Sequence, residues 1–371
     1  MSDHRESPGF SRGEGVKDAP GLCLGIETSC DETAAAVVAA DGTVRSNVVA
    51  SQAALHARYG GVVPELAARR HLEGLLPTVD LALAGAGVSW ADLGLVAVTR
   101  GPGLPAALLV GLAAGKALAF ARGLPLVGVN HLAAHLHAHA LDVQAAAGPD
   151  GLPRPSVGLL VSGSHTDLCL LPAGGGVRLL GTTLDDAAGE AFDKVARLLG
   201  LGYPGGPALD ALARAGDPVA VAFPRTTGPL GGARPAGPHL VGGAYAFSFS
   251  GLKTAVAVHL QGGAPAGRAD VAASFQAAVV EVLVAKTLAA ARAQGVRTIL
   301  VAGGVAANSA LRAGLTAAAG ARGLEVRFPP PRYCTDNAAM VAAAGWAEWR
   351  RGRRDGWGLD ADPNLPLELG G

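Results

Sequence analysis

Short apolar runs separated by polar turns mark the first part of the chain. Leu22 to Ile26 is an apolar run that ends in the polar residues 27–32 (ETSCDE). Ala34 to Ala40 and Val44 to Ala50 are two further runs, joined by Asp41-Gly42, a dipeptide typical of tight hairpins. This pattern predicts three neighbouring strands, the first of them buried.

Much the same pattern recurs later in the chain. Val157 to Val161 is an apolar run that leads into the polar residues 162–167 (SGSHTD). Further strands are predicted over Leu168 to Leu171 and Val177 to Thr182, with the glycine turn 174–176 between them. Two such copies predict an internally duplicated protein with two similar lobes. The alternative is chance recurrence, because β-hairpins are common.

Helical patterns and further strands lie between and after the copies. The predicted helices are Pro64 to Leu83, Pro105 to Arg122, Asp270 to Ala293 and Ser309 to Ala319, and the predicted strands are Leu93 to Thr99, Leu126 to Val129 and Thr298 to Val301. Strands that alternate with helices favour a largely parallel sheet with helices on its faces, which is an α/β fold. Residues 216–243 are rich in proline and glycine and predict an irregular excursion.

Length and charge fit two domains that are not strongly basic. The chain has 371 residues, 50% of them hydrophobic, which is enough for two domains of ordinary size. Its formal net charge is zero, so a nucleic acid must be held by a local basic patch or with a partner's help. Arg350 to Arg354 is one candidate patch, and a solvated helix end is the alternative.

The sequence predicts a cytoplasmic location and no membrane span. The four cysteines form no CxxC pair, and the first residues lack the layout of a signal peptide. Leu104 to Phe120 is the most apolar long stretch, but it is short for a span and contains Lys116, so a buried helix is expected. Residues 1–21 are expected to form a disordered tail.

Three predicted strands end in turns of small residues. These turns are 25–29 (GIETS), 160–164 (LVSGS) and 301–308 (VAGGVAAN). Backbone N–H groups at such turns can bind phosphate oxygens, because glycine lets the backbone approach closely. Together the turns resemble the phosphate and adenosine segments of the superfamily that holds actin, the sugar kinases and the heat-shock chaperone ATPases. The expected fold class is therefore a duplicated, two-lobe α/β fold of this type, with a nucleotide cleft between the lobes.

Two other segments allow more than one interpretation. Residues 101–106 (GPGLPA) fit a dinucleotide fingerprint, but no Asp or Glu occurs between Leu104 and Leu141 to bind the ribose, so a simple strand-to-helix turn is favoured. Residues 184–194 carry five charges next to the glycine turn 202–207. They predict either a solvated helix face or a site for a ribose or substrate.

Two histidines four residues apart are the strongest chemical signal. His131 and His135 share one face of a predicted helix, so both imidazoles can point at one ion, and the distant Asp336 can close a mononuclear site. His139 continues the same face, so at least one of these histidines is structural. Imidazole and carboxylate suit iron and zinc alike.

Alternatives to this metal site remain open in the sequence. Asp336 precedes an apolar helix and could be its N-cap instead of a ligand. Leu132 stands where an HExxH peptidase needs its glutamate, which argues against that class. Two histidines and a carboxylate could also form the facial triad of an Fe(II) oxygenase, although those sites commonly lie in β-barrels.

Nine motifs, spread from Leu22 to about Trp346, resemble those of the tRNA adenosine threonylcarbamoyltransferase family, once labelled O-sialoglycoprotein endopeptidase. The motifs are 25–33 (GIETSCDET), 59–67 (YGGVVPELA), 101–104 (GPGL), 130–135 (NHLAAH), 185–194 (DDAAGEAFDK), 203–207 (YPGGP), 247–254 (FSFSGLKT), 302–308 (AGGVAAN) and 333–337 (YCTDN). The resemblance implies an acyltransferase, an N6-L-threonylcarbamoyladenine synthase. Such an enzyme moves the threonylcarbamoyl group from threonylcarbamoyl-AMP to N6 of adenosine 37 in tRNAs that read codons starting with adenine.

The resemblance also implies roles for particular residues. One divalent metal ion per subunit, with Fe²⁺ favoured and Zn²⁺ possible, is expected on His131, His135 and Asp336. Asp31, Glu32 and the phosphate of the adenylate are the candidates for the general base. Substrate contacts are expected at Leu160, Val161, Ser162, Gly163, Ser164, Asp193, Gly206, Asp210 and Asn308. The expected lobes are 22–130 with 338–371, and 131–337.

The implied partners are tRNA, threonylcarbamoyl-AMP and two proteins, TsaB, a pseudo-enzyme of the same fold, and TsaE, an ATPase. Three departures from the family's usual motifs stand out. Ser164 replaces a glycine, Ala133-Ala134 replaces Glu-Gly, and Pro105-Ala106 replaces Val-Gly. If position 164 needs a positive φ, the serine costs about 1 kcal/mol. Other function classes are an ATPase or sugar-kinase-like enzyme of the same fold, a non-catalytic scaffold, and a metallopeptidase.

Overall fold

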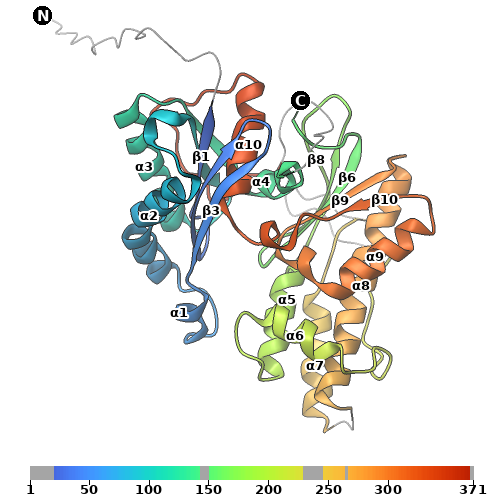
Figure 1. Ribbon diagram of the computed structural model, residues 1–371. Helices are drawn as coiled ribbons and strands as arrows, with labels where there is room; N and C mark the ends of the chain where they lie inside the picture. The colour runs from blue at the N-terminus through green and yellow to red at the C-terminus, as the bar shows by residue number, and fades with distance from the viewer. Residues whose placement is uncertain (1–20, 143–149, 229–244, 264–265, 368–371) are drawn as a thin grey trace, which may run out of the picture.

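The chain folds into two lobes, each built around a five-stranded sheet (Figure 1). The computed structural model describes residues 21–142, 150–228, 245–263 and 266–367. The expected tail, except Gly21, lies outside these residues, as does the second half of the excursion predicted at 216–243. Its first half, to residue 228, contains no helix or strand.

The first sheet has the strand order β3-β2-β1-β4-β5. Its strands are β1 (Leu22–Glu27), β2 (Glu32–Ala39), β3 (Val44–Ser51), β4 (Leu93–Gly101) and β5 (Leu126–Asn130). The hairpin strands β2 and β3 pair antiparallel, as do β1 and β2, whereas β4 and β5 run parallel to β1. The predicted strands are thus present, each within two residues of its expected ends.

The second sheet repeats this topology in the order β8-β7-β6-β9-β10. Its strands are β6 (Ser156–Val161), β7 (Thr166–Leu171), β8 (Arg178–Thr182), β9 (Thr298–Ala302) and β10 (Glu325–Arg327). The predicted duplication is confirmed. The prediction of a largely parallel sheet is wrong, because the hairpins place β2, β3, β7 and β8 antiparallel to their neighbours, and only the helix-linked strands run parallel.

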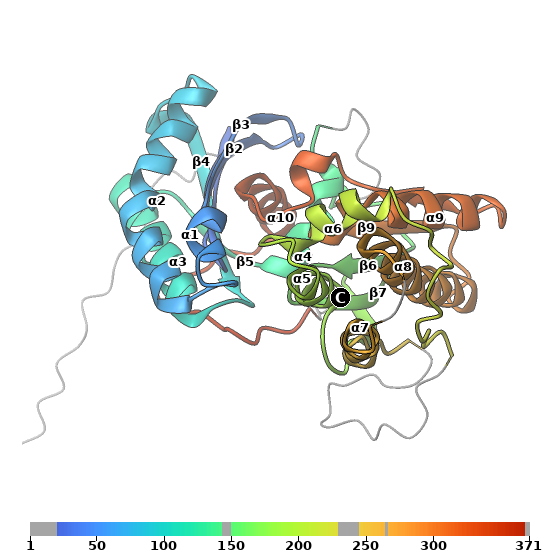
Figure 2. The same cartoon turned by 90° about the horizontal axis from the view of Figure 1, so that it is seen from below.

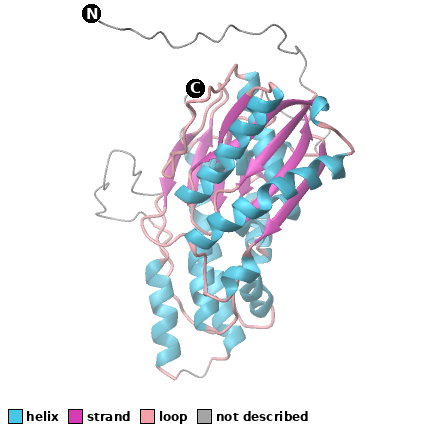
Figure 3. Ribbon diagram, turned by 90° about the vertical axis from the view of Figure 1, so that its left-hand side faces the viewer, coloured by secondary structure: helices cyan, strands magenta, loops and turns pink. Residues whose placement is uncertain are grey.

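Helices cover the faces of both sheets. They are α1 (Ala53–Ala57), α2 (Pro64–Ala86), α3 (Pro105–Arg122), α4 (His131–His137), α5 (Ala188–Leu198), α6 (Gly205–Ala213), α7 (Ser250–Gln261), α8 (Arg268–Ala293), α9 (Ser309–Gly320) and α10 (Ala338–Arg350). Helices α2 and α3 lie on one face of the first sheet and α10 on the other (Figure 2). Helices of the second lobe extend beyond its strands (Figure 3).

Helix α4 lies where the two lobes meet. It follows β5 directly and packs against α10 and β5 of the first lobe and against β6 and β9 of the second. All seven of its residues are buried. The functional histidines predicted from the sequence therefore project from the junction between the lobes.

Among the described residues, two helices are long and apolar enough, by length and composition, to cross a membrane: α3 and α8. Both pack on other elements here, and 78% of the most apolar window of α8 is buried. The buried helix expected at Leu104 to Phe120 is α3, which buries only one face. Leu109 and Phe120 on its outer face are 53% and 63% exposed.

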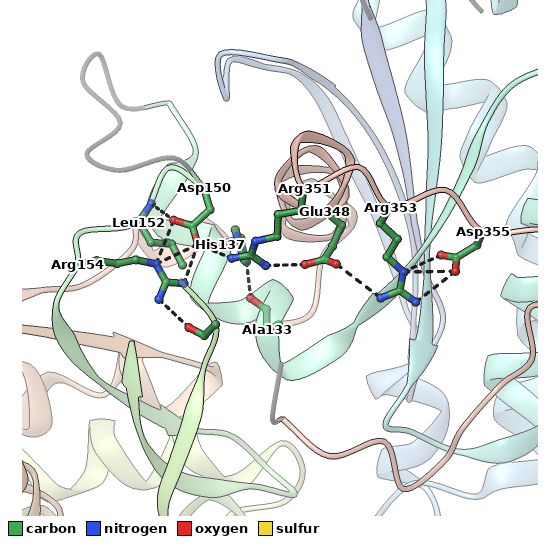
Figure 4. A network of polar contacts seen from close by, with 10 residues as sticks. Ala133, His137, Asp150, Leu152, Arg154, Glu348, Arg351, Arg353 and Asp355 are labelled. Atoms are coloured by element: carbon green, nitrogen blue, oxygen red, sulfur yellow. Dashed lines mark hydrogen bonds and ion pairs between the residues drawn. The ribbon is translucent and has the colours of Figure 1, made fainter. Parts of the chain in front are cut away.

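Ion pairs join the lobes behind α4 (Figure 4). Asp150, just before β6, accepts hydrogen bonds from Arg154 and from Arg351, which follows α10. Arg351 also pairs with Glu348, and Arg353 pairs with Glu348 and Asp355. Arg351 and Arg353 are therefore engaged with carboxylates, whereas the exposed Arg350 and Arg354 donate to backbone carbonyls at the end of the helix.

Candidate metal centre and nucleotide site

Asn130 sets the position of the two histidines on α4. As the last residue of β5 it is the N-cap, and its side-chain oxygen accepts hydrogen bonds from the N–H groups of Leu132 and Ala133 at 2.9 and 3.1 Å. His131 and His135 then follow one turn apart, with ring centroids separated by 4.7 Å. The i,i+4 spacing thus places both rings on one face, as the sequence predicts.

Asp336 lies opposite these rings, just before α10. Asn337, not Asp336, caps α10, because its side chain accepts a hydrogen bond from the N–H of Met340 at 3.1 Å. Asp336 Oδ1 lies 3.1 Å from His135 Nε2 and 3.6 Å from His131 Nε2. Asp336 is therefore not the N-cap of α10, and its carboxylate faces both imidazoles instead.

The three side chains have the composition and spacing of a cation site. One potential ligand atom from each of His131, His135 and Asp336 lies within 4.8 Å of the others. His135 is buried, yet neither of its ring nitrogens has a hydrogen-bond partner of suitable geometry among the described residues, despite the short distance to Asp336. Buried polar atoms normally have partners, so Nε2 of His135, the nitrogen that faces Asp336, fits a role as a metal ligand.

Glu27 lies behind His131. This fully buried carboxylate, at the end of β1, has Oε2 3.1 Å from His131 Nδ1. The hydroxyl of Thr99 donates to the same oxygen at 2.6 Å, and the N–H of Ser29 donates to Oε1 at 2.5 Å. A carboxylate beside Nδ1 keeps the proton on that nitrogen and leaves Nε2 free to bind a metal ion.

The charged groups at this site shift one another's pKa. Burial lowers the pKa of His131, but Glu27 and Asp336 outweigh it and raise the pKa to about 9. Burial raises the pKa of Glu27 and of Asp336, but the neighbouring histidines outweigh it and hold both below their usual values. A cation on the Nε2 atoms would take the place of the proton that His131 otherwise binds.

Asp31 and Glu32 lie after β1, and their environments differ. Burial, together with the charges of Asp336 and Asp31, raises the pKa of Glu32 to about 9, so Glu32 holds a proton at neutral pH. Asp31 is 7% exposed and accepts a long hydrogen bond, 3.5 Å, from the hydroxyl of Tyr203 in the second lobe. A protonated carboxyl is a poor proton acceptor, so the raised pKa argues against Glu32 as the general base.

The turn 160–164 after β6 packs closely on its neighbours. Gly303 has φ +93°, and a Cβ there would lie 2.4 Å from the carbonyl oxygen of Val161, so only glycine fits. The N–H of Gly189, in the first turn of α5, donates to the carbonyl of Ser162 at 3.2 Å. Asp142 is the only non-glycine residue with positive φ in the described chain, so Ser164 has no left-handed strain and the conditional cost does not arise.

The other expected substrate residues form two clusters in the second lobe. Asp193 of α5 accepts hydrogen bonds from the N–H groups of Gly205 and Gly206 at 2.8 and 3.3 Å, and so fixes the start of α6. Asp210 of α6 accepts from Asn308 at 3.3 Å, and the side chain of Asn308 also caps α9. The structure thus brings Asp193 to Gly206 and Asp210 to Asn308.

Three residues outside the predicted set also belong to this region. Glu27 supports His131, Tyr203 reaches Asp31, and His165 interacts electrostatically with His131, His135 and Asp336. Burial and the two imidazoles lower the pKa of His165 to about 4, which makes it a neutral ring beside the cluster. All three stand in motifs visible in the sequence, but their partners lie far along the chain.

Comparison with known proteins decides the family. Residues 43–343 match the TsaD family, described as tRNA N6-adenosine threonylcarbamoyltransferase. A protein of that name from Symbiobacterium thermophilum is 56% identical over 356 residues, which are 95% of this chain and 98% of the relative. Its namesake from Moorella thermoacetica is 54% identical over 93% of this chain and 96% of its own length.

The chain belongs to the tRNA N6-adenosine threonylcarbamoyltransferase family. It is therefore an enzyme, a transferase that modifies tRNA by threonylcarbamoylation. The resemblance inferred from the nine motifs is confirmed.

Solved structures confirm the two-lobe fold class of this transferase. HypF from T. kodakarensis aligns with a TM-score of 0.59 at 16% identity, over 90% of this chain and 48% of that one. Full-length HypF in a phosphate- and nucleotide-bound form aligns with a TM-score of 0.55 at 14% identity, over 90% and 46%. At such low identity these likenesses concern the fold alone.

Proposed function

We propose that this transferase moves the threonylcarbamoyl group from threonylcarbamoyl-AMP to N6 of adenosine 37 in tRNAs that read codons starting with adenine. The convergence of His131, His135 and Asp336 carries this proposal. It lies at the junction of the lobes, beside the neutral His165 at the end of the turn 160–164. A cation held by these three side chains would lie next to the backbone N–H groups of the turn 160–164. This arrangement suits a donor whose carbamoyl group is bonded to a phosphate.

One divalent metal ion per subunit, Fe²⁺ in preference to Zn²⁺, would be held by His131, His135 and Asp336. When bound, such an ion supplies Lewis-acid stabilisation to oxygens of the donor, worth several kcal/mol in the transition state. Glu27 orients His131 for this role through Nδ1. The buried Nε2 of His135, which faces Asp336 at 3.1 Å, supports the assignment.

The donor would be held mainly by the second lobe. The backbone of Leu160, Val161, Ser162, Gly163 and Ser164 would contact the phosphate, and Asp193, Gly206, Asp210 and Asn308 would contact the nucleoside. Asp193 uses only Oδ1 for the N–H groups of α6, which leaves Oδ2 to accept a hydrogen bond from a ribose hydroxyl. Holding donor and tRNA together in the right geometry then supplies much of the rate enhancement.

The transfer itself forms a bond between adenine N6 and the carbamoyl carbon and breaks the bond from that carbon to the phosphate oxygen. AMP is the leaving group, and Asp31 is the better candidate to accept the N6 proton, with the phosphate of the adenylate as the alternative. Glu32, whose pKa is raised to about 9, would donate a hydrogen bond to the substrate rather than accept a proton.

We further propose a cytoplasmic enzyme that works with TsaB and TsaE and does not bind membranes. The neutral net charge supports a need for partners, because the described basic run at 351–353 is already paired with carboxylates. Binding of tRNA would then rest on a surface shared with these proteins.

The experiment is a transfer assay with tRNA, threonylcarbamoyl-AMP, TsaB, TsaE and ATP, read by nucleoside mass spectrometry. Wild-type protein should form threonylcarbamoyl-adenosine, and His131→Ala should form less than about 1% of it, since the loss of several kcal/mol is more than 100-fold. His139→Gln is the matched control, because the ring of His139 donates to the carbonyl of Val301 at 3.1 Å, a bond that glutamine can keep. Full activity of His131→Ala would refute the metal-dependent chemistry.

A further inference from the structure

A buried polar cluster lies in the first lobe beneath the loop that carries Asp31 and Glu32. Its members are Thr33, Gln52, His56 and His71, which are between 0% and 7% exposed. In the described part of the chain, no hydrogen bond or ion pair joins them to His131, His135 or Asp336. Two fully buried imidazoles inside an apolar lobe are costly unless their nitrogens are all hydrogen-bonded.

The loop is anchored through three consecutive carbonyl groups. The N–H of Leu104, at the start of α3, donates to Ser29 O at 2.8 Å, and the N–H of Gln52, at the start of α1, donates to Asp31 O at 3.0 Å. The carbonyl between them, Cys30 O, is held by the side chain of His71 from α2, at 2.9 Å. His71 is thus the one side chain among the three anchors.

The hydrogen-bond partners of His71 fix its tautomer. A carbonyl oxygen can only accept, so Nε2 of His71 carries the proton that it donates to Cys30. Nδ1 is then an acceptor, and it receives the hydroxyl of Thr33 at 2.8 Å and the amide nitrogen of Gln52 at 3.5 Å. Burial lowers the pKa of His71, which favours this neutral form.

The chain of donors continues from Gln52 to a second histidine. The side-chain nitrogen of Gln52 also donates to Ala67 O at 3.3 Å, so its oxygen faces Nε2 of His56, at 3.3 Å. His56 Nε2 is therefore the donor, and His56 Nδ1 accepts from the N–H of Val63 at 3.2 Å. The hydrogen bonds therefore run in one direction, from the N–H of Val63 before α2 to the carbonyl of Cys30 in the loop after β1, and each donor meets an acceptor.

The far end of this series touches the second lobe. Val63 closes the turn 59–63 (YGGVV), in which Gly60 and Gly61 have φ of +71° and +158°. The guanidinium of Arg197, on α5, donates a hydrogen bond to the carbonyl of Gly60. The turn that meets α5 is therefore linked, through His56, Gln52 and His71, to the loop that holds the two acids.

We propose that His71 is a positioning residue, the last link of a relay that couples the docking of the turn 59–63 on the second lobe to the placement of Asp31 and Glu32. The proposal rests on the function proposed above. It assigns His71, Gln52 and His56 to holding the loop, with no contact to substrate. A leucine could fill the space of His71, but it could not anchor Cys30.

Two substitutions at one position separate anchoring from packing. His71→Gln keeps a nitrogen donor near the place of Nε2, and His71→Leu keeps the volume without a donor. His71→Leu should lower kcat of the transfer by about 10- to 100-fold with a small change in KM for tRNA, because misplacement of a reacting group acts on the chemical step. His71→Gln should recover most of kcat. Equal kcat for wild type and His71→Leu, at unchanged metal content, would overturn the proposal.

Two readouts do not depend on the transfer reaction. Hydrogen–deuterium exchange of the peptide that spans 28–33 should be faster in His71→Leu than in wild type and should return to the wild-type rate in His71→Gln. The ¹⁵N chemical shifts of His71 should report a neutral ring protonated at Nε2 between pH 6 and 8. Unchanged exchange, or protonation at Nδ1, would contradict the relay.

These outcomes distinguish the two proposals. An inactive wild-type protein with normal exchange and ¹⁵N results would refute the proposed function and leave the relay supported.

Should His71→Leu fail to fold, Thr33→Val removes only the hydroxyl that orients His71. This variant should speed hydrogen–deuterium exchange of the peptide 28–33. It should also lower kcat about 3- to 10-fold, because the lost hydrogen bond is worth about 1 kcal/mol. If both the exchange rate and kcat of Thr33→Val equalled those of wild type, the relay would be overturned.

Discussion

At the scale of single residues, Glu27 sets how well His131 can bind a cation. It is fully buried, and its carboxylate accepts hydrogen bonds from Thr99 and Ser29 as well as facing His131. Carboxylate partners of this kind raise the basicity of a ligand histidine and fix its orientation. A substitution of Glu27 should therefore change the affinity for the metal ion, although Glu27 is not one of the proposed ligands.

Glu27→Gln should weaken metal binding by about 10- to 100-fold, the usual effect of removing such a partner. Glutamine keeps the shape and can still accept from Thr99, so the fold should be retained. The measurement is the metal dissociation constant by competition with a chelator. Thr99→Val, which removes one hydrogen bond to the same oxygen but no charge, is the control and should change the constant less. Equal affinity of Glu27→Gln and wild type would show that His131 needs no carboxylate partner.

Asp167 on β7 gives a pH dependence whose sign can be worked out. It is 4% exposed, and burial, opposed in part by a hydrogen bond with Thr182, raises its pKa from 3.8 to about 6. Between pH 4 and 6 the folded state therefore binds more protons than the unfolded state. The free energy of unfolding falls as pH rises through this window and stays lower above it.

Asp167→Asn should remove this pH-dependent fall in the free energy of unfolding. At pH 7 it should raise the free energy of unfolding by up to about 3 kcal/mol, from 1.36 kcal/mol per pKa unit over about two units. At pH 3, where Asp167 is protonated in both states, the gain should vanish. Urea unfolding at several pH values tests this, with Asp80→Asn, an exposed acid on α2, as the control. A gain that is equal at pH 3 and pH 7 would rule out this titration as its cause.

At the scale of elements, asparagine N-caps place the helices that carry the site. Asn130 caps α4, Asn308 caps α9, and Asn337 caps α10. Each cap follows a strand or loop and aligns the next helix, and Asn337 also fixes the residue before it, Asp336. From the sequence, Asp336 was the alternative candidate for this cap, and the structure uses Asn337 instead, because Asp and Asn are both good N-caps.

Asn337→Ala should therefore have two effects. It should lower the free energy of unfolding by about 1 kcal/mol, within the range of about 0.5–2 for a lost N-cap. It should also weaken metal binding, because the backbone that presents Asp336 is no longer held. Asn337→Asp retains a capping oxygen and should restore stability. Urea unfolding and metal titration measure the two effects, and a fully stable Asn337→Ala would exclude the cap as the anchor of α10.

Most elements could be predicted from the sequence, and those that could not depend on tertiary contacts. Apolar runs such as Leu22 to Ile26 identify strands because buried strands must be apolar. Helix α6 has no such signal. It begins with Gly205-Gly206-Pro207, residues with poor helix propensity, and its start is held by Asp193 of α5. The hairpin signals predicted antiparallel pairs, but the sheets were expected to be largely parallel and are in fact mixed.

At the scale of the whole molecule, the site exists only where distant segments meet. Spacing on one helix identifies His131 and His135, because i and i+4 share a face. Nothing in the local sequence relates Tyr203 to Asp31 or His165 to Asp336, since these contacts depend on how the two lobes pack. The relative placement of the lobes therefore determines the chemistry, and the contacts that fix it can be tested.

The interlobe ion pair of Asp150 and Arg351 is the clearest of these contacts. The side chain of Asp150 is 3% exposed, and Arg351 Nη2 lies 2.8 Å from its Oδ2. Arg351→Met leaves Asp150 paired with Arg154, so the expected loss of stability is moderate, about 1–3 kcal/mol. Asp150→Asn should cost more, about 3–5 kcal/mol, because the buried Arg154 loses its carboxylate partner and Arg351 loses one of its two.

A double-mutant cycle of Arg351→Met and Asp150→Asn should give a coupling energy of about 1–3 kcal/mol in urea unfolding. The exposed pair Arg70 and Glu73 on α2 is the matched control and should couple by less than about 0.5 kcal/mol. Because α10 packs on the first sheet and Asp150 leads into β6, loss of the pair should also loosen the lobes. The radius of gyration of Arg351→Met by X-ray scattering should rise, and kcat should fall because Asp31 and Tyr203 come from different lobes. Coupling no stronger than in the control pair, with an unchanged radius, would mean that apolar packing around α4 alone sets the distance between the lobes.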